Sequence, residues 1–458
     1  MDAPQSRAAA RWGWPSAATQ NDLKVLLRLA GPVTASRLGV TAMGLTDAVV
    51  VGRYSAVQLG YHALGWAPSS VVLTATFGLL TGVQVMTAQA VGEGRRRAAG
   101  AVLRRGLSYA LMIGLLASLA LALLGPLFLH SVGLARPLAD GATPILLIFC
   151  LSLVPAAVSV AATSWLEALS MAAPVMVLMW LANGVNLAVD LVLVPGRFGL
   201  PAMGAAGGAW ATFGARSALA VGALAYIALM PQARALGVFD KPPRDRVAEA
   251  LQRRIGYGAG ASNFVEVAAF AGMNIVAGWI GGLAVAAWTV VLNVTSIIFM
   301  IPLGLATATA VTVGRCYGAR DAAGLDRAAR VGFGVAAALA VAIALVIWPN
   351  AAWVARIYTT DPTVVRLASG ALVLSCLFFV PDALQVVIAQ ALRARGEVWL
   401  PTATHLASYA LVMTPLAWFL ALGLHMGLTG VVCAVIVASL CSAGLLLARF
   451  ALLARRGI

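Results

Sequence analysis

Long apolar runs follow one another along this chain, and short polar stretches separate them. Twelve runs are each about 20 residues long or longer, enough at roughly 1.5 Å per residue to cross a hydrocarbon layer of about 30 Å as a helix. They lie near residues 25–51, 66–90, 103–127, 141–162, 172–194, 205–229, 255–279, 285–311, 331–349, 365–390, 402–422 and 428–448. The pattern predicts an all-α integral membrane protein with twelve transmembrane helices.

Composition agrees with this interpretation. Of 458 residues, 61% are hydrophobic and only 10% are charged, whereas a soluble domain carries roughly 25% charged residues. The first 23 residues mix charges with proline and lack the compact apolar stretch of a secretory signal, so we expect them to be retained.

Landmark residues recur at a constant offset of 226 positions. The pairs are Gly52 and Gly278, Gly78 and Gly304, Gly92 and Gly318, Gly106 and Gly332, Pro155 and Pro381, and Leu166 and Leu392. The repeat predicts two six-helix lobes in the same orientation, related by a pseudo-two-fold axis along the membrane normal. We expect an N-lobe over 1–230, a polar cytoplasmic linker over 231–254 and a C-lobe over 255–458.

The net charge of +15 is unevenly distributed over the predicted loops. If the N-terminus is cytoplasmic, 24 of the 31 Lys and Arg residues fall on the cytoplasmic side. Because cytoplasmic loops are enriched in these residues, the pattern places both termini in the cytoplasm. We therefore assign the basic charge to topology and contact with anionic lipids, and not to nucleic acid.

The sequence carries no motif for enzymatic chemistry. It has no phosphate-binding loop, no HExxH and no GxSxG, and its four histidines are scattered singly. The five cysteines lie mostly within apolar runs and show no metal-binding spacing. Two lobes around a central space favour transport by alternating access, with no cofactor and with an ion gradient as the energy source.

Four carboxylates lie within predicted spans, at some distance from the ends: Asp47, Asp190, Glu266 and Asp382. A charged side chain is costly inside a bilayer, so we expect each to have a functional role, with a partly structural one for Asp190 near its helix end.

Amides accompany these acids. Asn183, Asn186 and Asp190 are spaced three and four residues apart, so they share one face of a helix. In the second half, Asn263 shares a face with Glu266, and Gln385 shares one with Asp382, beside the helix-bending Pro381. Stripes of oxygen ligands suit a proton or a small hard cation.

These motifs resemble those of the multidrug and toxic compound extrusion (MATE) family, over nearly the whole chain. The resemblance rests on GPVTASRLGVTAMGLTDAVVVG in the first span, GYGAGASNFVEVAAF in the seventh and PDALQVVIAQALR in the tenth. Glu266 with Asp382 favours the NorM-like branch. Two positions depart from the family pattern: Gly258 replaces a proline, and the glycine after the tenth-helix turn is displaced to Gly396.

The resemblance implies a bacterial inner-membrane antiporter that exports cationic lipophilic drugs and dyes in exchange for inward Na⁺ or H⁺. It further implies an N-lobe cation and substrate site of Asp47, Asn186, Asp190 and Thr212, and a C-lobe site of Glu266 and Asp382. Na⁺ is a candidate at Asp47, Asn186 and Asp190, or at Glu266 and Asp382. We expect a monomer.

A flippase for lipid-linked oligosaccharides is the alternative that shares this fold. It should have a more cationic cavity to hold a pyrophosphate, whereas acids give the strongest signal within the predicted spans. The sequence leaves open the physiological substrate, the coupling ion and the conformational state.

Overall fold

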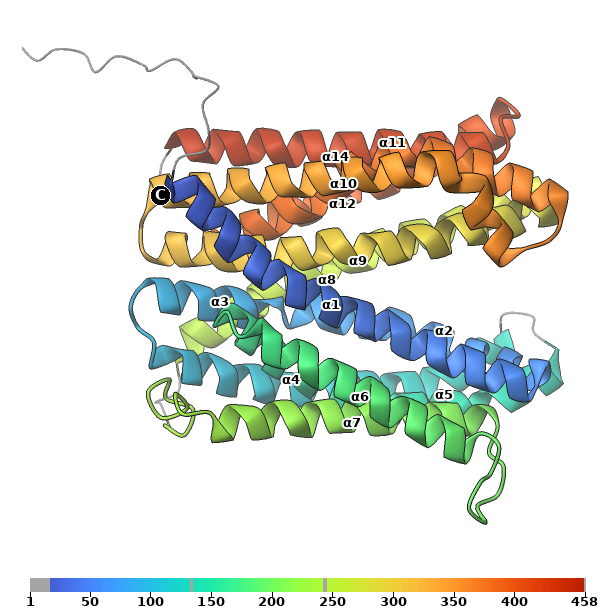
Figure 1. Ribbon diagram of the computed structural model, residues 1–458, viewed down its shortest axis with the longest axis horizontal. Helices are drawn as coiled ribbons and strands as arrows, with labels where there is room; N and C mark the ends of the chain where they lie inside the picture. Colours follow the sequence, from blue (N-terminus) through green and yellow to red (C-terminus); the bar gives the residue numbers. More distant parts are fainter. Residues whose placement is uncertain (1–16, 132–134, 242–244, 457–458) are drawn as a thin grey trace, which may run out of the picture.

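The computed structural model describes residues 17–131, 135–241 and 245–456, and helices make up nearly all of this part of the chain (Figure 1). The first half contains α1 (Ala17–Tyr54), α2 (Ala56–Leu79), α3 (Thr81–Gly92), α4 (Ala98–Ser131), α5 (Arg136–Ala168), α6 (Ala172–Leu193) and α7 (Ala205–Leu229). The second half contains α8 (Arg246–Ile280), α9 (Gly282–Gly318), α10 (Ala322–Tyr358), α11 (Pro362–Ala394), α12 (Trp399–His405), the π-helical η1 (Leu406–Met413), α13 (Thr414–Trp418), the π-helical η2 (Phe419–Gly423) and α14 (Leu428–Arg456). Parts of the predicted N-lobe (1–16 and 132–134), linker (242–244) and C-lobe (457–458) lie outside the described residues.

The predicted set of twelve transmembrane helices is confirmed. In the described ranges, 11 helical segments are long and apolar enough to cross a membrane, with α2–α3 and α12–η2 each forming one segment. The twelfth is α1, which is 38 residues long and includes the charged residues Lys24, Arg28 and Arg37. Six of these segments form each lobe.

Three predicted runs differ in detail from the helices. The run over 141–162 continues as α5 to Ala168, which brings Glu167 inside the helix. The run over 66–90 is divided at Leu80 into α2 and α3. The run over 402–422 contains two π-helical turns, which apolar periodicity does not distinguish from α-helix.

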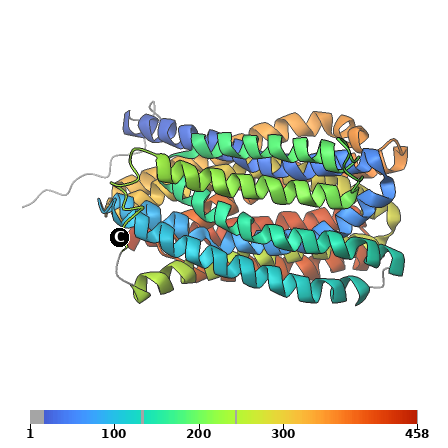
Figure 2. The same cartoon turned by 90° about the horizontal axis from the view of Figure 1, so that it is seen from below.

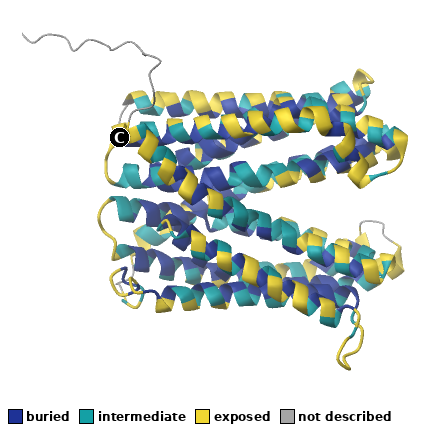
Figure 3. Ribbon diagram, in the orientation of Figure 1, coloured by how far each residue is buried: buried dark blue, intermediate teal, exposed yellow. Residues whose placement is uncertain are grey.

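The outer faces of the helices carry exposed leucines. Leu115, Leu119 and Leu123 follow one face of α4 and are 59% to 64% exposed. Figure 3 shows that buried residues concentrate between the helices, while exposed ones follow the outside of the bundle. A stripe of bare leucines suits a lipid environment, where an apolar side chain has no water to avoid.

Two helices pass from one lobe to the other. The first turns of α1 pack against α9 and α10 through Leu26, Leu29 and Val33, and its later turns pack on α6. The helix α8 begins against α2 and α3 and ends within the second lobe. In Figure 1 both run obliquely between the two groups of helices, and Figure 2 shows the same bundle from below.

The lobes meet through backbone contacts that obey the sequence repeat. A Cβ atom on Gly92 would lie 2.0 Å from the carbonyl oxygen of Arg315, and one on Gly318 would lie 2.2 Å from that of Gln89. Adding the offset of 226 to Gly92 and Gln89 gives Gly318 and Arg315, so each contact is the image of the other. Only glycine lets the two backbones approach this closely.

A second pair of contacts obeys the same rule. A Cβ on Gly78 would lie 2.5 Å from Cα of Gly260, and one on Gly304 would lie 2.1 Å from Oγ1 of Thr34. The offset again relates Gly78 to Gly304 and Thr34 to Gly260. The repeated glycines therefore explain how two homologous lobes interlock about a pseudo-two-fold axis.

The polar loops gather at the end of the molecule where the lobes meet, on the left in Figure 1. There the backbone N–H of Gly100 donates to the carbonyl of Leu236, over 2.8 Å. The Arg97 guanidinium donates a hydrogen bond to Asp240 that lowers the pKa of this carboxyl from its ordinary value. The helix α8 starts at Arg246, capped by Asp245, so the end of the 231–254 stretch is already helical. The lobe boundaries themselves stay a prediction.

Candidate functional site

A cavity of about 180 Å³ lies within the N-lobe. Side chains of α1, α2, α5, α6 and α7 line it, including the aromatic Trp66 and Phe77 and the apolar Val160 and Met179. An apolar wall with a few polar groups is the usual form of a small-molecule site.

Asp47 is the carboxylate in this wall, and it is only 2% exposed. Asn186 Nδ2 donates to its Oδ1 over 2.8 Å, and the Thr212 hydroxyl donates to its Oδ2. The His62 Nε2 atom lies 3.8 Å from the same Oδ2. Helices α2, α6 and α7 thus each present a polar group to one carboxylate on α1.

Asp190 lies behind this cluster on α6 and is completely buried. Among the described residues, neither of its carboxyl oxygens has a hydrogen-bond partner. It is close enough to Asp47 for the two groups to interact electrostatically. Two neighbouring carboxyl groups repel when both are charged, which favours a proton or a bound cation between them.

Two arginines share the cavity wall with Asp47. Arg216 donates to Ser152 Oγ over 2.6 Å, and its guanidinium carbon lies 5.2 Å from the ring centroid of Trp66. The charges in the wall are therefore more evenly balanced than the acids of the sequence suggested. The arginines gain this position because α1 and α7 turn them inward, which the sequence alone did not specify.

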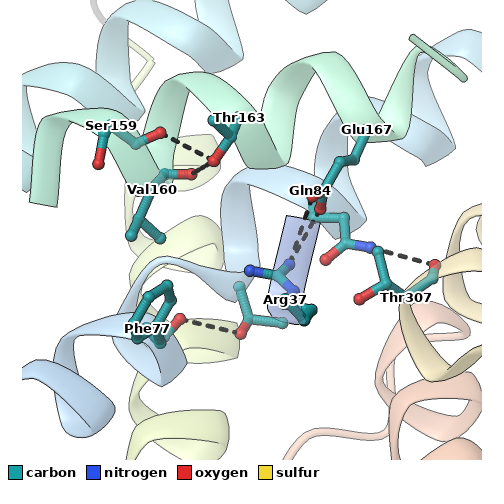
Figure 4. Close-up of polar contacts among 9 residues, drawn as sticks. Arg37, Phe77, Gln84, Ser159, Val160, Thr163, Glu167 and Thr307 are labelled. Carbon is teal, nitrogen blue, oxygen red and sulfur yellow. Dashed lines mark hydrogen bonds and ion pairs between the residues drawn. The ribbon is translucent and has the colours of Figure 1, made fainter. Parts of the chain in front are cut away.

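Arg37 forms an ion pair with Glu167 across α1 and α5, with Nη2 and Oε2 separated by 3.1 Å (Figure 4). Arg37 on α1 thus neutralises the carboxylate of another helix. Glu167 was missed, because it follows the predicted end of its apolar run. Trp165 and Leu166 were the signal that the helix continues.

The Arg37–Glu167 pair lies beside a hydrogen bond that joins the lobes. Gln84 Nε2 on α3 donates to the carbonyl oxygen of Thr307 on α9 over 3.2 Å, and Figure 4 shows both interactions side by side. The inner wall of the N-lobe cavity is therefore next to the region of lobe contact.

The C-lobe acids share an amide. Gln385 Nε2 lies 3.4 Å from Glu266 Oε1 and 3.5 Å from Asp382 Oδ1. The hydroxyl of Ser442 donates to Gln385 Oε1 over 3.5 Å. Helices α8 and α11 thus bring together three predicted residues that the sequence separates by up to 119 positions, and α14 adds Ser442.

Two predicted site residues lie apart from the carboxylates they were expected to join. Asn183 donates to the carbonyl oxygens of Gly39 and Met179, over 3.0 and 2.9 Å, and so fastens α6 to α1. Asn263 is half-buried on α8, and among the described residues no hydrogen bond joins it to Glu266. Spacing along a helix sets the direction in which a side chain points. The position of the neighbouring helix determines which group that side chain contacts.

Comparison with known proteins gives a consistent result. The MatE family model matches twice, over residues 32–192 and 259–419, and the two matches begin 227 residues apart, which agrees with the repeat. The chain is 61% identical to the probable multidrug resistance protein NorM of Caulobacter vibrioides, over 96% of this chain and 93% of that one. It is 31% identical to the multidrug resistance protein PmpM of Pseudomonas aeruginosa, over 89% of each chain. The crystal structure of the eukaryotic MATE transporter AtDTX14 superposes with a TM-score of 0.88 at 19% identity, covering 96% of this chain and 98% of that one.

Proposed function

Since this chain belongs to the MATE family of multidrug efflux transporters, we propose that it exports cationic, amphipathic compounds in exchange for inward Na⁺ or H⁺. It is a multi-pass protein of the bacterial inner membrane and a transporter, not an enzyme. The observation that carries the proposal is the buried Asp47 carboxylate in an aromatic, apolar cavity. A carboxylate in such a wall offers charge to a cation whose remaining surface is apolar.

Exchange follows from competition for the same charge. In a low dielectric, one carboxylate cannot neutralise a drug cation and a coupling ion at once, so binding of one disfavours binding of the other. Asp47 with Asn186, Asp190 and Thr212 supplies one such group, and Asp382 with Glu266 and Gln385 supplies the second. We assign one exchange site to each lobe.

Alternating access completes the mechanism. The lobes touch through Gly92 and Gly318 at the end that carries the polar loops. The excess of Lys and Arg at this end favours a cytoplasmic position, so we assign the present conformation to the state closed toward the cytoplasm. Rocking of one lobe against the other would open that end. Each chain contains both lobes, and we propose that it works as a monomer.

The test compares charge-removing variants in proteoliposomes with an imposed Na⁺ or pH gradient. Asp47→Asn and Asp382→Asn should each reduce gradient-driven export of a cationic dye by about tenfold or more. A hydrogen bond to a charged group contributes roughly 1.5–3 kcal/mol, and about 1.4 kcal/mol corresponds to a factor of ten.

The matched control is Asp361→Asn, because Asp361 caps α11 and asparagine caps a helix equally well. This control should export at the wild-type rate. Wild-type rate and ion dependence in both Asp47→Asn and Asp382→Asn would disprove the exchange mechanism. Comparing the two gradients identifies the coupling ion, and export of anionic dyes alone would overturn the substrate class.

Asp190→Asn should reduce export less than Asp47→Asn in the same assay. Asn186 and Thr212 donate to Asp47, whereas the Asp190 oxygens accept no hydrogen bond from a described residue. An equal loss in the two variants would show that both carboxylates exchange ions.

The flippase alternative finds less support in the cavity. A pyrophosphate needs guanidinium groups that are free to bind it, but Arg37 is paired with Glu167 and Arg216 is held by Ser152 and Trp66. Movement of a fluorescent lipid-linked sugar between leaflets, without dye export, would favour the flippase.

A further inference from the structure

A second group of buried polar side chains lies in the C-lobe, apart from the carboxylates already described. His405 ends α12, Tyr409 lies on η1, Ser439 lies on α14, and Arg393 lies near the end of α11. Each is at most 3% exposed. Within the described part of the chain, these buried atoms have no hydrogen-bond partner: His405 Nε2, Ser408 Oγ, Gln390 Oε1, and Nε and Nη2 of Arg393. The Tyr409 and Ser439 hydroxyls face each other.

These side chains are neighbours, and they adjoin the acidic pair. The rings of His405 and Tyr409 have centroids 5.7 Å apart. Tyr409 is near Ser439 and within electrostatic range of Glu266 and Asp382. Arg393 interacts in the same way with Glu266 and with His405.

The orientation of His405 is fixed from one side. Its Nδ1 atom shares a hydrogen bond of 2.6 Å with the hydroxyl of Ser262 on α8. The opposite nitrogen, Nε2, is therefore the one without a protein partner. A neutral imidazole donates from one nitrogen and accepts at the other, so it can pass a proton along a chain of hydrogen bonds.

The local backbone also departs from regular helix. The π-helical η1 spans Leu406–Met413 and contains both Ser408 and Tyr409. The Thr414 hydroxyl donates to the carbonyl oxygen of Tyr409 over 3.2 Å. π-Helical turns are rare in proteins, but those that do occur are often found at functional sites.

Buried polar atoms in native proteins almost always have partners, and internal water supplies them where the protein does not. The orphan atoms of His405 and Arg393 belong to side chains that interact with each other, and Arg393 also interacts with Glu266. An apolar region would stay dry, whereas a region lined by hydroxyl, imidazole and guanidinium groups holds water.

We propose that this region is a hydrated chamber that relays protons between Glu266 and the loop end of α11, with His405 and Tyr409 as relay groups. The proposal rests on the function proposed above and specifies H⁺ as a coupling ion. One proton leaves the Glu266 carboxyl for the nearest water, and one proton is released to solution at the far end, so charge and atoms balance.

The charged groups that face the chamber suit proton transfer from Glu266 toward the loop end of α11. They are Glu266 from α8 and Asp382 and Arg393 from α11, while α14 and η1 contribute the hydroxyls of Ser439 and Tyr409. The positive Arg393 stabilises Glu266 once its proton has gone.

The first test measures hydration without reference to transport. Radiolytic hydroxyl-radical footprinting with mass spectrometry labels buried side chains that adjoin internal water. Tyr409 and His405 in the full-length protein should be labelled at least about tenfold faster than Trp165, which is equally buried and donates to the carbonyl of Ala99. Equal labelling of Tyr409 and Trp165 would show a dry region and overturn the proposal.

The second test measures proton movement in proteoliposomes loaded with a pH-sensitive dye. His405→Phe and Tyr409→Phe should reduce substrate-driven proton flux by about tenfold or more, since a positioned proton-transfer group typically contributes roughly 10²–10⁴-fold. Binding of a cationic dye should stay at the wild-type level. The ratio of proton flux in H₂O to proton flux in D₂O should differ from the wild-type ratio. Ser375→Ala is the control, because this buried hydroxyl already donates to the carbonyl of Ala371 over 2.7 Å.

The outcomes separate this proposal from the proposed function. Wild-type proton flux and an unchanged D₂O effect in both phenylalanine variants would refute the relay. Dye export driven by Na⁺ with no proton flux in the wild type would also refute the relay, but would leave the export function intact. If no gradient drives export in the wild type, the proposed function fails together with the relay.

Discussion

Single charged side chains decide what the N-lobe cavity can hold. Asp47 is available because Asn186 and Thr212 orient its two oxygens from α6 and α7. Arg37 would compete with a cationic substrate if its charge were free, but Glu167 neutralises it from α5. Asp47 therefore lines the cavity with Arg216, while the charge of Arg37 is neutralised by Glu167.

The Arg37–Glu167 pair should stabilise the folded protein. Glu167→Gln leaves Arg37 without its counter-ion, and we expect a lower melting temperature in detergent. The loss should lie toward the lower end of the roughly 3–5 kcal/mol found when a buried pair is broken, because the Arg37 side chain is still 17% exposed.

A double-variant cycle isolates this interaction. Arg37→Met combined with Glu167→Gln should regain much of the stability lost in Glu167→Gln alone, because no unpaired charge then remains. A melting temperature of Glu167→Gln equal to that of the wild type would show that the pair contributes nothing measurable.

At the scale of elements, glycine spacing controls how closely the lobes approach. Gly92 in α3 and Gly318 in α9 each face a backbone carbonyl of the other lobe. The same helices also carry the polar link between Gln84 and Thr307. This contact holds the loop end of the molecule closed while the opposite ends of the lobes diverge (Figure 1).

Gly92→Ala should therefore shift the protein away from this conformation. A methyl group at 2.0 Å from the Arg315 carbonyl oxygen forces the lobes apart, and such overpacking costs roughly 1–3 kcal/mol. Pulsed electron spin resonance between labels at Arg96 and Arg320, on opposite sides of the contact, should show a longer mean distance.

The control is Gly334→Ala in α10, where a Cβ atom meets nothing within 4 Å. This variant should keep the wild-type distance distribution. An unchanged distribution in Gly92→Ala would show that the contact does not hold the lobes together.

At the scale of the whole molecule, charge should set the orientation in the membrane. The loops at the end where the lobes meet include Arg95, Arg96, Arg97 and Arg320, and the linker adds further basic residues. We predict that both termini and the 231–254 segment are cytoplasmic. Fusions to alkaline phosphatase at the linker should be inactive, and fusions to green fluorescent protein should be fluorescent. The opposite pattern would reverse the orientation and with it the assignment of the open side.

The chain by itself determined the architecture. The length of the twelve apolar runs matches the thickness of a bilayer, and the offset of 226 reflects two lobes with the same order of helices. Both features are local or periodic in the sequence, so they can be predicted without knowing which helices are in contact. The four intramembrane acids could also be predicted as site residues, because a charged residue inside an apolar run is rare and usually functional.

Only the tertiary structure decided which groups act on one another. Asn186, Thr212 and Asp47 come from three helices, and nothing in their spacing specified that they meet, whereas Asn183 satisfied the helix-face rule and yet fastens two helices. Glu167, His62 and the buried polar groups around His405 were not identified from the sequence, because each interacts with a partner on another helix or has buried atoms without a partner. Helical periodicity is a local property of the backbone, but hydrogen bonding and charge pairing inside a bundle depend on the rotation and approach of separate helices, which packing between the lobes fixes.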